Sequence, residues 1–209
     1  MNKAYVEYVY RLIENKEIGK PIYTREISRC VAETYNIRLN SAAKVVSVVC
    51  KNFMNEKIIP ELRSYQRGIY YRTLLTPFGE VGIDKEQLIE DRYLKNDSGY
   101  ETGLIALHRL GLTTQMPNER TLVTNKAGGC VRIDRKLGVT VKPPKIEINA
   151  TNKQYLKILD LLEILNNAPV DVEHPYKIIG EYIDRLGLEY GELITLANDY
   201  YDESIPKFV

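Results

Sequence analysis

The chain has 209 residues, of which 44% are hydrophobic and 27% are charged, the balance of an ordinary globular protein. No apolar run approaches the roughly 18 residues that a membrane-spanning helix needs, so we expect no membrane partner. The three cysteines, Cys30, Cys50 and Cys130, are far apart and form no C-x-x-C pair. This spacing indicates neither a disulfide framework nor a zinc site, and we expect a protein of the reducing cytoplasm.

The net charge of +1 hides an uneven distribution along the chain. Residues 1–75 hold 13 Lys and Arg against 7 Asp and Glu, and residues 76–142 hold 10 against 9. Residues 143–209 are acidic, with 6 against 12. A basic head with an acidic end is expected where one part of a protein meets a polyanion and the other part must not. Ordinary solvated helix surfaces would give the same numbers and stay open as an alternative.

The N-terminal part is predicted to form three helices and a β-hairpin. Apolar residues recur at three- and four-residue steps over residues 4–15, the pattern of an amphipathic helix. Thr24 is placed to cap a second helix, and Asn40 or Ser41 to cap a third. Two extended runs around residues 64–68 then predict a hairpin. Three helices followed by a hairpin is the order of a winged helix-turn-helix, so this part is predicted to be a DNA-binding domain of residues 1–75.

The remaining residues, 76–209, are predicted to form a mixed C-terminal domain. Its expected elements are helices 84–95 and 102–110, strands 121–124 and 131–141, and helices 153–166, 176–186 and 191–201. Leu and Ile cover most of helix 153–166, so we expect it to pack the helical, acidic residues 143–209 onto residues 76–142. The predicted fold class is therefore α+β: a winged helix-turn-helix followed by a mixed α/β C-terminal domain that ends in helices.

The third helix carries the predicted DNA-reading surface. Val46, Val49 and their apolar neighbours turn one side to the core, whereas Lys44, Ser47 and Lys51 fall on the other side. Short polar and basic side chains on the last helix before a hairpin can donate to phosphates and base edges. For this helix taken alone, a solvated surface with two lysines is the slightly better interpretation.

The hairpin shifts that balance toward DNA. Arg63, Tyr65 and Arg67 are predicted to gather at its tip, which suits a wing that lies along the phosphate backbone. Arg25 and Arg29 on the second helix add charge within reach of phosphates.

Catalysis finds little support in the sequence. The two histidines, His108 and His174, are far apart; we expect the first to be half-buried in a helix and the second to lie in a turn. No H-E-x-x-H, G-x-S-x-G or Walker motif is present. The sequence therefore predicts a protein that is not an enzyme and that uses no cofactor or metal.

Two stretches are more distinctive than a generic domain. The wing strand R-G-I-Y-Y (Arg67–Tyr71), followed by T-P-F-G-E, and the segment S-G-Y-E-T-G-L-I-A-L-H-R-L-G-L-T-T-Q-M-P (Ser98–Pro117) resemble the AbiEi-type antitoxin and abortive-infection regulator family. The resemblance covers roughly the first 140 residues in order, and its most specific element is L-G-L-T-T-Q-M-P followed by a strand that ends at Thr124-Asn125. The helical tail after Pro144 matches only loosely.

This resemblance implies a role in a type IV toxin–antitoxin system. Such an antitoxin represses its own operon by binding double-stranded operator DNA, for which we expect inverted repeats, and opposes a nucleotidyltransferase-like toxin without necessarily binding it tightly. The family's DNA-contacting helix and wing correspond here to Ser41, Lys44, Ser47, Lys51, Arg63 and Arg67. The motif around Gly103, His108 and Gly111 is implied to define packing.

Two other classes of function compete with this hypothesis. The second is a winged-helix module whose acidic C-terminal part is chiefly a protein-interaction platform, which predicts a stable co-purifying partner. The third is an enzyme, for example a nuclease, which predicts metal-dependent activity that is lost when carboxylates are mutated. An adjacent nucleotidyltransferase-like reading frame with inverted repeats upstream would favour the antitoxin hypothesis.

Overall fold

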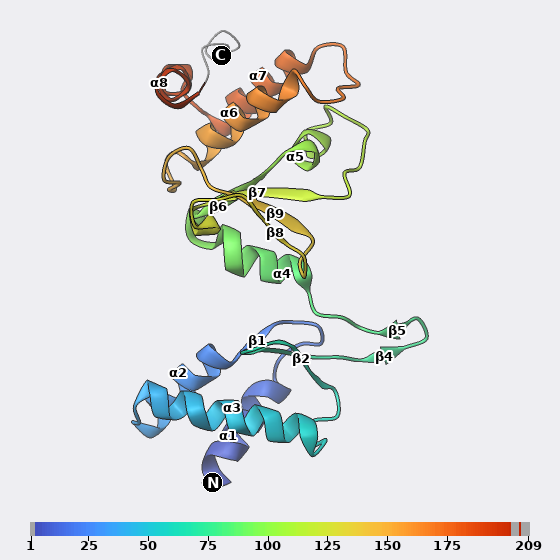
Figure 1. The fold of residues 1–209 in the computed structure, drawn as a ribbon, viewed down its shortest axis with the longest axis vertical. Coiled ribbons are helices and arrows are strands. Elements are labelled where there is room, and N and C mark those ends of the chain that lie inside the picture. Colours follow the sequence, from blue (N-terminus) through green and yellow to red (C-terminus); the bar gives the residue numbers. More distant parts are fainter. Residues whose placement is uncertain (1–2, 202–204, 206–209) are drawn as a thin grey trace. The chain divides into compact units, whose positions relative to one another are not determined.

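The chain folds into helices and small sheets that form two compact units. The computed structural model describes residues 3–201 and residue 205. It is mixed α and β, as predicted, and divides into residues 1–88 (unit 1) and residues 89–209 (unit 2) (Figure 1). Among the described residues, no helix is both long enough and apolar enough to cross a membrane.

Three helices make up most of unit 1. They are α1 (Lys3–Glu14), α2 (Thr24–Tyr35) and α3 (Leu39–Asn55), and the ends of α1 lie within one residue of the predicted range 4–15. Each is amphipathic, so their apolar stripes meet in one core on one side of a small sheet (Figure 1). The buried members of this core include Val9, Ile13, Ile22, Val31, Val46, Val49, Phe53 and Leu62.

The predicted caps of α2 and α3 are wrong. Thr24 is the first residue of α2, and Asn40 and Ser41 lie inside the first turn of α3, which begins at Leu39. Neither helix has a side-chain hydrogen bond at its N-cap. The Thr24 hydroxyl donates instead to the carbonyl oxygen of Gly68 at 3.2 Å, because the hairpin turn reaches it.

A three-stranded antiparallel sheet completes unit 1. Its strands are β1 (Ile22–Tyr23), β2 (Leu62–Gln66) and β3 (Ile69–Arg72), in the order β1-β3-β2. The turn between β2 and β3 is tighter than the predicted residues 64–68. It consists of Arg67 and Gly68, and Gly68 has the positive φ of +82° that such a turn requires. A register shift between Ser64 and Gln66 makes Tyr65 a β-bulge.

A second, very short hairpin follows this sheet. Its strands are β4 (Leu75–Thr76) and β5 (Gly79–Glu80). Leu75 and Phe78 are 77% and 101% exposed, so β4 and its turn present apolar surface to solvent.

After this hairpin the chain returns to unit 1. The Asp84 amide donates to the Gly19 carbonyl oxygen at 2.8 Å, and its carboxylate pairs with Lys20 at 2.9 Å. The same carboxylate accepts a hydrogen bond from the Gln87 amide at 3.0 Å, so Asp84 caps the next helix. Unit 1 thus extends past residue 75, where the sequence indicated a break, to residue 88.

Unit 2 is built on a four-stranded mixed sheet with the order β6-β7-β9-β8. The strands are β6 (Gly99–Thr102), β7 (Arg120–Thr124), β8 (Arg132–Asp134) and β9 (Val139–Lys142). β7 and β9 run parallel, and the other neighbours run antiparallel. The helices of unit 2 are α5 (Leu104–Arg109), α6 (Lys153–Leu165), α7 (Pro175–Leu186) and α8 (Tyr190–Tyr200), and α4 (Lys85–Ile89) leads into it from unit 1. α4, which spans the boundary between the units, continues as a π-helical turn, Glu90–Leu94, that contacts β6 and β7.

Two elements of unit 2 differ from the prediction. The segment around the predicted helix 102–110 begins with strand β6, and the helix proper starts only at Leu104. Gly103 separates them with a φ of +77°, a conformation that would not continue a helix. The predicted strand 131–141 is two strands, β8 and β9, joined by a turn that ends at Gly138. The end of α5 just before Gly111 agrees with the prediction.

Helix α6 forms the centre of the unit 2 core, as predicted. Leu156, Ile158, Leu159, Leu161, Leu162 and Leu165 are all buried. They belong to one cluster with Tyr100, Leu107 and Val123 of the preceding segment and with apolar residues of α7 and α8. Helix α6 therefore packs onto the sheet, and α7 and α8 pack into the same core, so these helices do not form a free tail (Figure 1).

Candidate nucleic-acid interface

Helices α2 and α3 are joined by a short, well-defined turn. α2 ends at Tyr35, and Asn36 adopts a left-handed conformation with φ of 49°, which Asn tolerates better than most residues. The Ile37 amide then donates to the Ala32 carbonyl oxygen at 3.0 Å, and α3 begins at Leu39. Three connecting residues is the length found between the two helices of a helix-turn-helix.

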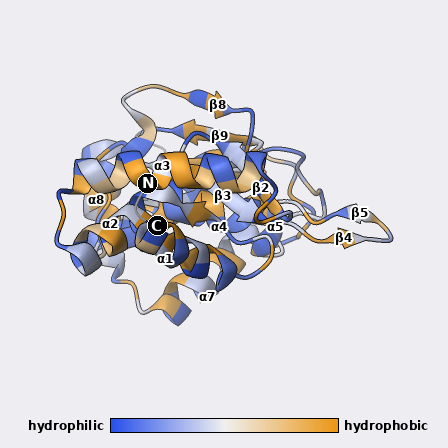
Figure 2. Cartoon of the chain, turned by 90° about the horizontal axis from the view of Figure 1, so that it is seen from below, coloured by the Kyte–Doolittle hydropathy of each residue, from blue (hydrophilic) through white to orange (hydrophobic). Residues whose placement is uncertain are grey.

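The side of α3 opposite the core is polar and exposed. Ala42, Val46, Val49, Cys50 and Phe53 are buried, which fixes the helix about its axis. Ser41, Lys44, Ser47 and Lys51 are all exposed on the remaining surface. The apolar and polar residues alternate along α3 as bands (Figure 2). The structure thus places the four residues predicted for α3 where a ligand can reach them.

One further residue on this surface was not predicted. Val48 is 49% exposed, next to Ser47 and one turn beyond Lys44. An exposed valine among donors can contact the methyl group of thymine, which side-chain donors cannot recognise. The sequence contained a signal for it, because Val48 falls outside the three- and four-residue steps that place the other apolar residues of α3 on the buried side.

The hairpin turn docks on the start of α2. The Gly68 carbonyl oxygen accepts hydrogen bonds from the Thr24 amide at 3.0 Å and from the Thr24 hydroxyl at 3.2 Å. Arg67 and Arg25 directly adjoin these two residues in sequence, and both are exposed. The structure therefore brings the predicted Arg25 and Arg67 into one neighbourhood.

Arg63 and Tyr65 are placed differently from the prediction. Arg63 lies near the start of β2, away from the turn, and its guanidinium contacts the Glu80 carboxylate at 2.7 Å. The same group donates to the Pro60 carbonyl oxygen at 2.7 Å. Tyr65 is only partly exposed, at the bulge. Of the three residues expected at the tip, only Arg67 lies there, since the turn has two residues.

The basic side chains around α2 and α3 are available for a ligand. Within the part of the chain that the structure describes, six basic side chains on α2, α3 and the adjoining turns form no ion pair or side-chain hydrogen bond: Arg25, Arg29, Arg38, Lys44, Lys51 and Arg67. Elsewhere in the described part of unit 1, four basic side chains are paired, such as Arg72 with Glu61 at 2.7 Å, and four more form no ion pair: Lys3, Lys16, Lys57 and Lys85. Six of the ten unpaired basic side chains in the described part of unit 1 thus lie on the helix pair and its turns.

Two carboxylates reduce the net charge of unit 1 without touching this surface. The hydrogen bond from Arg63 lowers the pKa of Glu80, and the Gln87 amide followed by Lys20 lowers the pKa of Asp84. Both carboxylates therefore stay ionised at neutral pH and neutralise Arg63 and Lys20. Residues 1–88 hold 14 Lys and Arg against 10 Asp and Glu, a net +4, and two of these acids are used in this way.

Neither histidine forms a hydrogen bond or an ion pair with an acidic residue in the described structure. His108 is half-buried on α5, and His174 is exposed just before α7. Across residues 3–201 and residue 205, no three His, Cys, Asp or Glu side chains lie together in a way that would hold a metal ion.

The surface described above is thus a helix pair, a short turn and a hairpin turn that carry unpaired cations. Compared with known proteins, the chain matches no protein-family model, no curated protein and no solved structure.

Proposed function

We propose that this chain is a cytoplasmic DNA-binding autorepressor and the antitoxin of a bacterial toxin–antitoxin operon, with unit 1 as a winged helix-turn-helix. The observation that carries the DNA-binding half is the exposed side of α3. Lys44 and Lys51 lie there without ion pairs in the described structure, beside Ser41 and Ser47. A helix with this side in the major groove presents donors to phosphates and base edges.

The arrangement of unit 1 supports the same proposal. The order α1, β1, α2, α3, β2, β3, with β3 between β1 and β2, leaves the hairpin next to a helix-turn-helix pair. The wing is short, because its turn is tied to Thr24. Arg67 at this turn and Arg25 beside it would contact phosphates on either side of the groove that α3 enters.

The antitoxin half of the proposal rests on the sequence resemblance. The L-G-L-T-T-Q-M-P segment that carries it is tied into unit 2 by Asp171, whose carboxylate accepts hydrogen bonds from the Thr114 amide and hydroxyl at 2.6 Å. This contact supports a packing role for the motif. The proposed antagonist is a nucleotidyltransferase-like toxin, opposed through unit 2.

A binding titration tests the DNA half. The full chain is titrated onto a duplex from upstream of its own reading frame, with fluorescence anisotropy at several salt concentrations. If Arg25, Lys44, Lys51 and Arg67 each neutralise a phosphate, the logarithm of affinity should fall with the logarithm of salt at a slope of roughly −3 to −4. A scrambled duplex of equal length should bind more weakly. Affinity that is flat in salt, or equal on both duplexes, would overturn the proposal.

Substitutions on α3 separate base contacts from phosphate contacts. Ser47→Ala is expected to reduce the preference for the operator over the scrambled duplex by about 1–3 kcal/mol, since a base contact is lost. Thr195→Ala on α8 in unit 2 removes an exposed hydroxyl of similar size and serves as the control. An unchanged preference in Ser47→Ala would place a different element in the groove.

A growth assay tests the antitoxin half. The chain is co-expressed with the nucleotidyltransferase-like protein encoded beside it, and rescue of growth is scored. The double variant Lys44→Ala/Lys51→Ala should lose DNA binding and keep rescue when both genes stand under a foreign promoter. Absence of rescue by the wild-type chain would remove the antitoxin function and leave the DNA-binding proposal standing.

A protein-interaction platform is the second candidate, and one observation favours it. Tyr176, Tyr190, Ile194 and Tyr200 are each about two-fifths exposed on α7 and α8, and Tyr side chains are enriched in protein interfaces. Exposed acidic residues surround them in the sequence: Asp171, Glu173, Glu181, Asp184, Glu189, Glu192 and Asp199. Retention of a specific partner by the wild-type chain, lost in Tyr200→Ala/Ile194→Ala, would establish it.

A further inference from the structure

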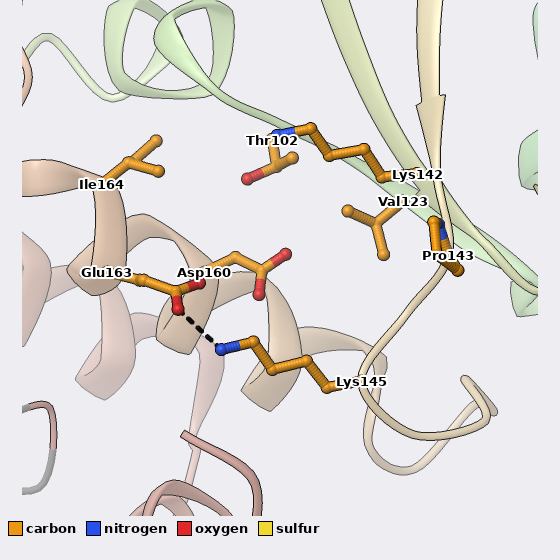
Figure 3. A pocket seen from close by; sticks show the side chains of 8 residues that line it. All are labelled: Thr102, Val123, Lys142, Pro143, Lys145, Asp160, Glu163 and Ile164. Atoms are coloured by element: carbon orange, nitrogen blue, oxygen red, sulfur yellow. Dashed lines mark hydrogen bonds and ion pairs between the residues drawn. The ribbon is translucent and has the colours of Figure 1, made fainter. Parts of the chain in front are cut away.

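Unit 2 contains a small pocket of mixed charge between its sheet and α6. The pocket has a volume of about 120 Å³, several times what one water molecule needs. Its lining comes from β6, β7, the end of β9 and α6: Thr102, Val123, Lys142, Pro143, Lys145, Asp160, Glu163 and Ile164 (Figure 3).

One buried polar group in this pocket lacks a partner. Thr102 is only 5% exposed, and within the described structure its hydroxyl forms no hydrogen bond. A buried hydroxyl without a partner loses its hydrogen bonds to water and gains none, so such groups are normally satisfied. The pocket into which Thr102 faces is thus the place from which a partner would come.

The charged side chains in the pocket differ in whether they already have an ion-pair or hydrogen-bond partner. Glu163 pairs with Lys145 at 2.6 Å, the contact drawn in Figure 3. The Asp160 carboxylate accepts hydrogen bonds from Tyr100 at 2.9 Å and from Tyr201 at 2.7 Å, and still has lone pairs for further donors. Lys142 is exposed and forms no ion pair in the described structure. Figure 3 shows its side chain extending toward Thr102.

This balance selects one class of small molecule. A metal ion would meet two ammonium groups, and a simple anion would meet two carboxylates, so either carries a repulsive contact. An organic cation with a single positive charge would likewise be repelled by the Lys142 ammonium group. A molecule with one positive and one negative end matches both: its carboxylate toward Lys142 and the Thr102 hydroxyl, its ammonium toward Asp160. Val123 and Ile164 supply apolar contact for a short side chain.

We propose that this pocket binds a small zwitterionic α-amino acid. Thr102 and Lys142 hold its carboxylate, Asp160 accepts hydrogen bonds from its ammonium group, and the pocket limits its side chain to a few atoms. The site lies wholly within unit 2.

Isothermal titration calorimetry of the full chain tests this assignment. The probes are glycine, L-alanine and L-serine, with acetate and methylamine as probes that carry one charge only. At least one amino acid should bind saturably at one site per chain, and both single-charge probes should bind at least about tenfold more weakly, because each leaves one end of the pocket unmatched.

Isosteric variants locate the site. Thr102→Val removes only a hydroxyl that has no partner without the ligand, so its melting temperature should equal or exceed that of the wild type. Its affinity for the amino acid should fall about tenfold, as should that of Lys142→Met. Thr140→Val, on β9 but outside the pocket lining, should bind as the wild type does.

Three results would overturn the proposal. They are no saturable heat with any amino acid, which would mean that only water fills the pocket; equal affinity for a single-charge probe; and unchanged affinity in both Thr102→Val and Lys142→Met.

Discussion

At the scale of single residues, two aspartates of unit 2 have opposite electrostatic environments. Burial raises the pKa of Asp160, although Tyr201 and Tyr100 donate hydrogen bonds to it. Hydrogen bonds from the Thr114 amide and hydroxyl lower the pKa of Asp171, which lies at the surface. Asp160 therefore favours the folded state at low pH, whereas Asp171 favours it at higher pH.

The first prediction follows from this contrast. For Asp160, the folded pKa lies above the unfolded one, so its favourable contribution is complete below the ordinary pKa and is lost as pH rises through the raised value. Asp160→Asn cannot ionise and should gain stability relative to the wild type as pH rises from about 4 to 7. Urea unfolding of both proteins across this range measures the difference.

Asp171→Asn is the control with the opposite sign. The folded pKa of Asp171 is lowered, so its contribution is present above the ordinary pKa and is lost as pH falls through the lowered value. The free energy of unfolding of this variant should fall relative to that of the wild type as pH rises from about 3 to 5. If the two variants show the same trend, the environments described above are incorrect.

A second residue-scale prediction separates two arginines of the hairpin. Arg67→Ala should weaken binding about equally on operator and scrambled duplexes, because phosphates carry no sequence identity. Arg63→Ala should change binding much less, since its guanidinium already contacts Glu80 and the Pro60 carbonyl oxygen. Anisotropy titrations at one salt concentration compare them. A larger loss from Arg63→Ala would indicate that the Glu80 pair opens when DNA binds.

At the scale of secondary-structure elements, strand β6 is held by close backbone packing. A Cβ atom on Gly99 would lie 2.5 Å from the Tyr93 carbonyl oxygen and 2.7 Å from that of Val123. Neither backbone oxygen can move without disturbing the sheet or the π-helical turn. Gly99 thus permits β6 to lie where it does, pairing with β7 from its first residue.

The third prediction tests this packing. Gly99→Ala should lower the free energy of unfolding of unit 2 by about 1–3 kcal/mol, the cost of overpacking a tight core. Gly191→Ala near the start of α8 adds the same methyl group where nothing lies within 4 Å. It should be neutral or stabilising, because Ala favours helix over Gly. Thermal unfolding of the two variants gives the comparison, and equal losses would contradict the packing argument.

The elements differ in how far they could be predicted from the sequence. The long helices were predictable because apolar residues at three- and four-residue steps recur over several turns. β1 has two residues and β6 has four, too few for a period, and both become strands through partners distant in sequence, β3 and β7. The ion pair of Arg63 could not be predicted for the same reason, because its partner Glu80 lies 17 positions away across a second hairpin.

At the scale of the whole molecule, the acidic C-terminal part is integral to unit 2. The buried face of α6 covers Tyr100, Leu107 and Val123, which come from the segment before residue 143. Removal of residues 144–209 would expose these three residues as one apolar surface. Monomeric proteins rarely expose an apolar patch of that kind.

The fourth prediction is that a chain ending at Pro143 aggregates. Each buried Leu or Ile of α6 accounts for about 1.5–3 kcal/mol of burial energy, which the truncated chain lacks. A chain ending at residue 88 retains the complete core of unit 1 and should stay folded and monomeric. Size-exclusion chromatography with light scattering distinguishes them. A monomeric, folded 1–143 chain would show that α6 is dispensable.

The position of Ile205 in the unit 2 core also has a consequence during synthesis. Unit 1 has all its core residues once residue 70 has emerged, whereas the core of unit 2 joins Tyr100 to Tyr201 and Ile205. Domains fold as units as the chain is made, and contacts between distant residues form late. On the ribosome, therefore, unit 1 will reach its native state while unit 2 is still incomplete, and unit 2 will close only once residue 205 has emerged.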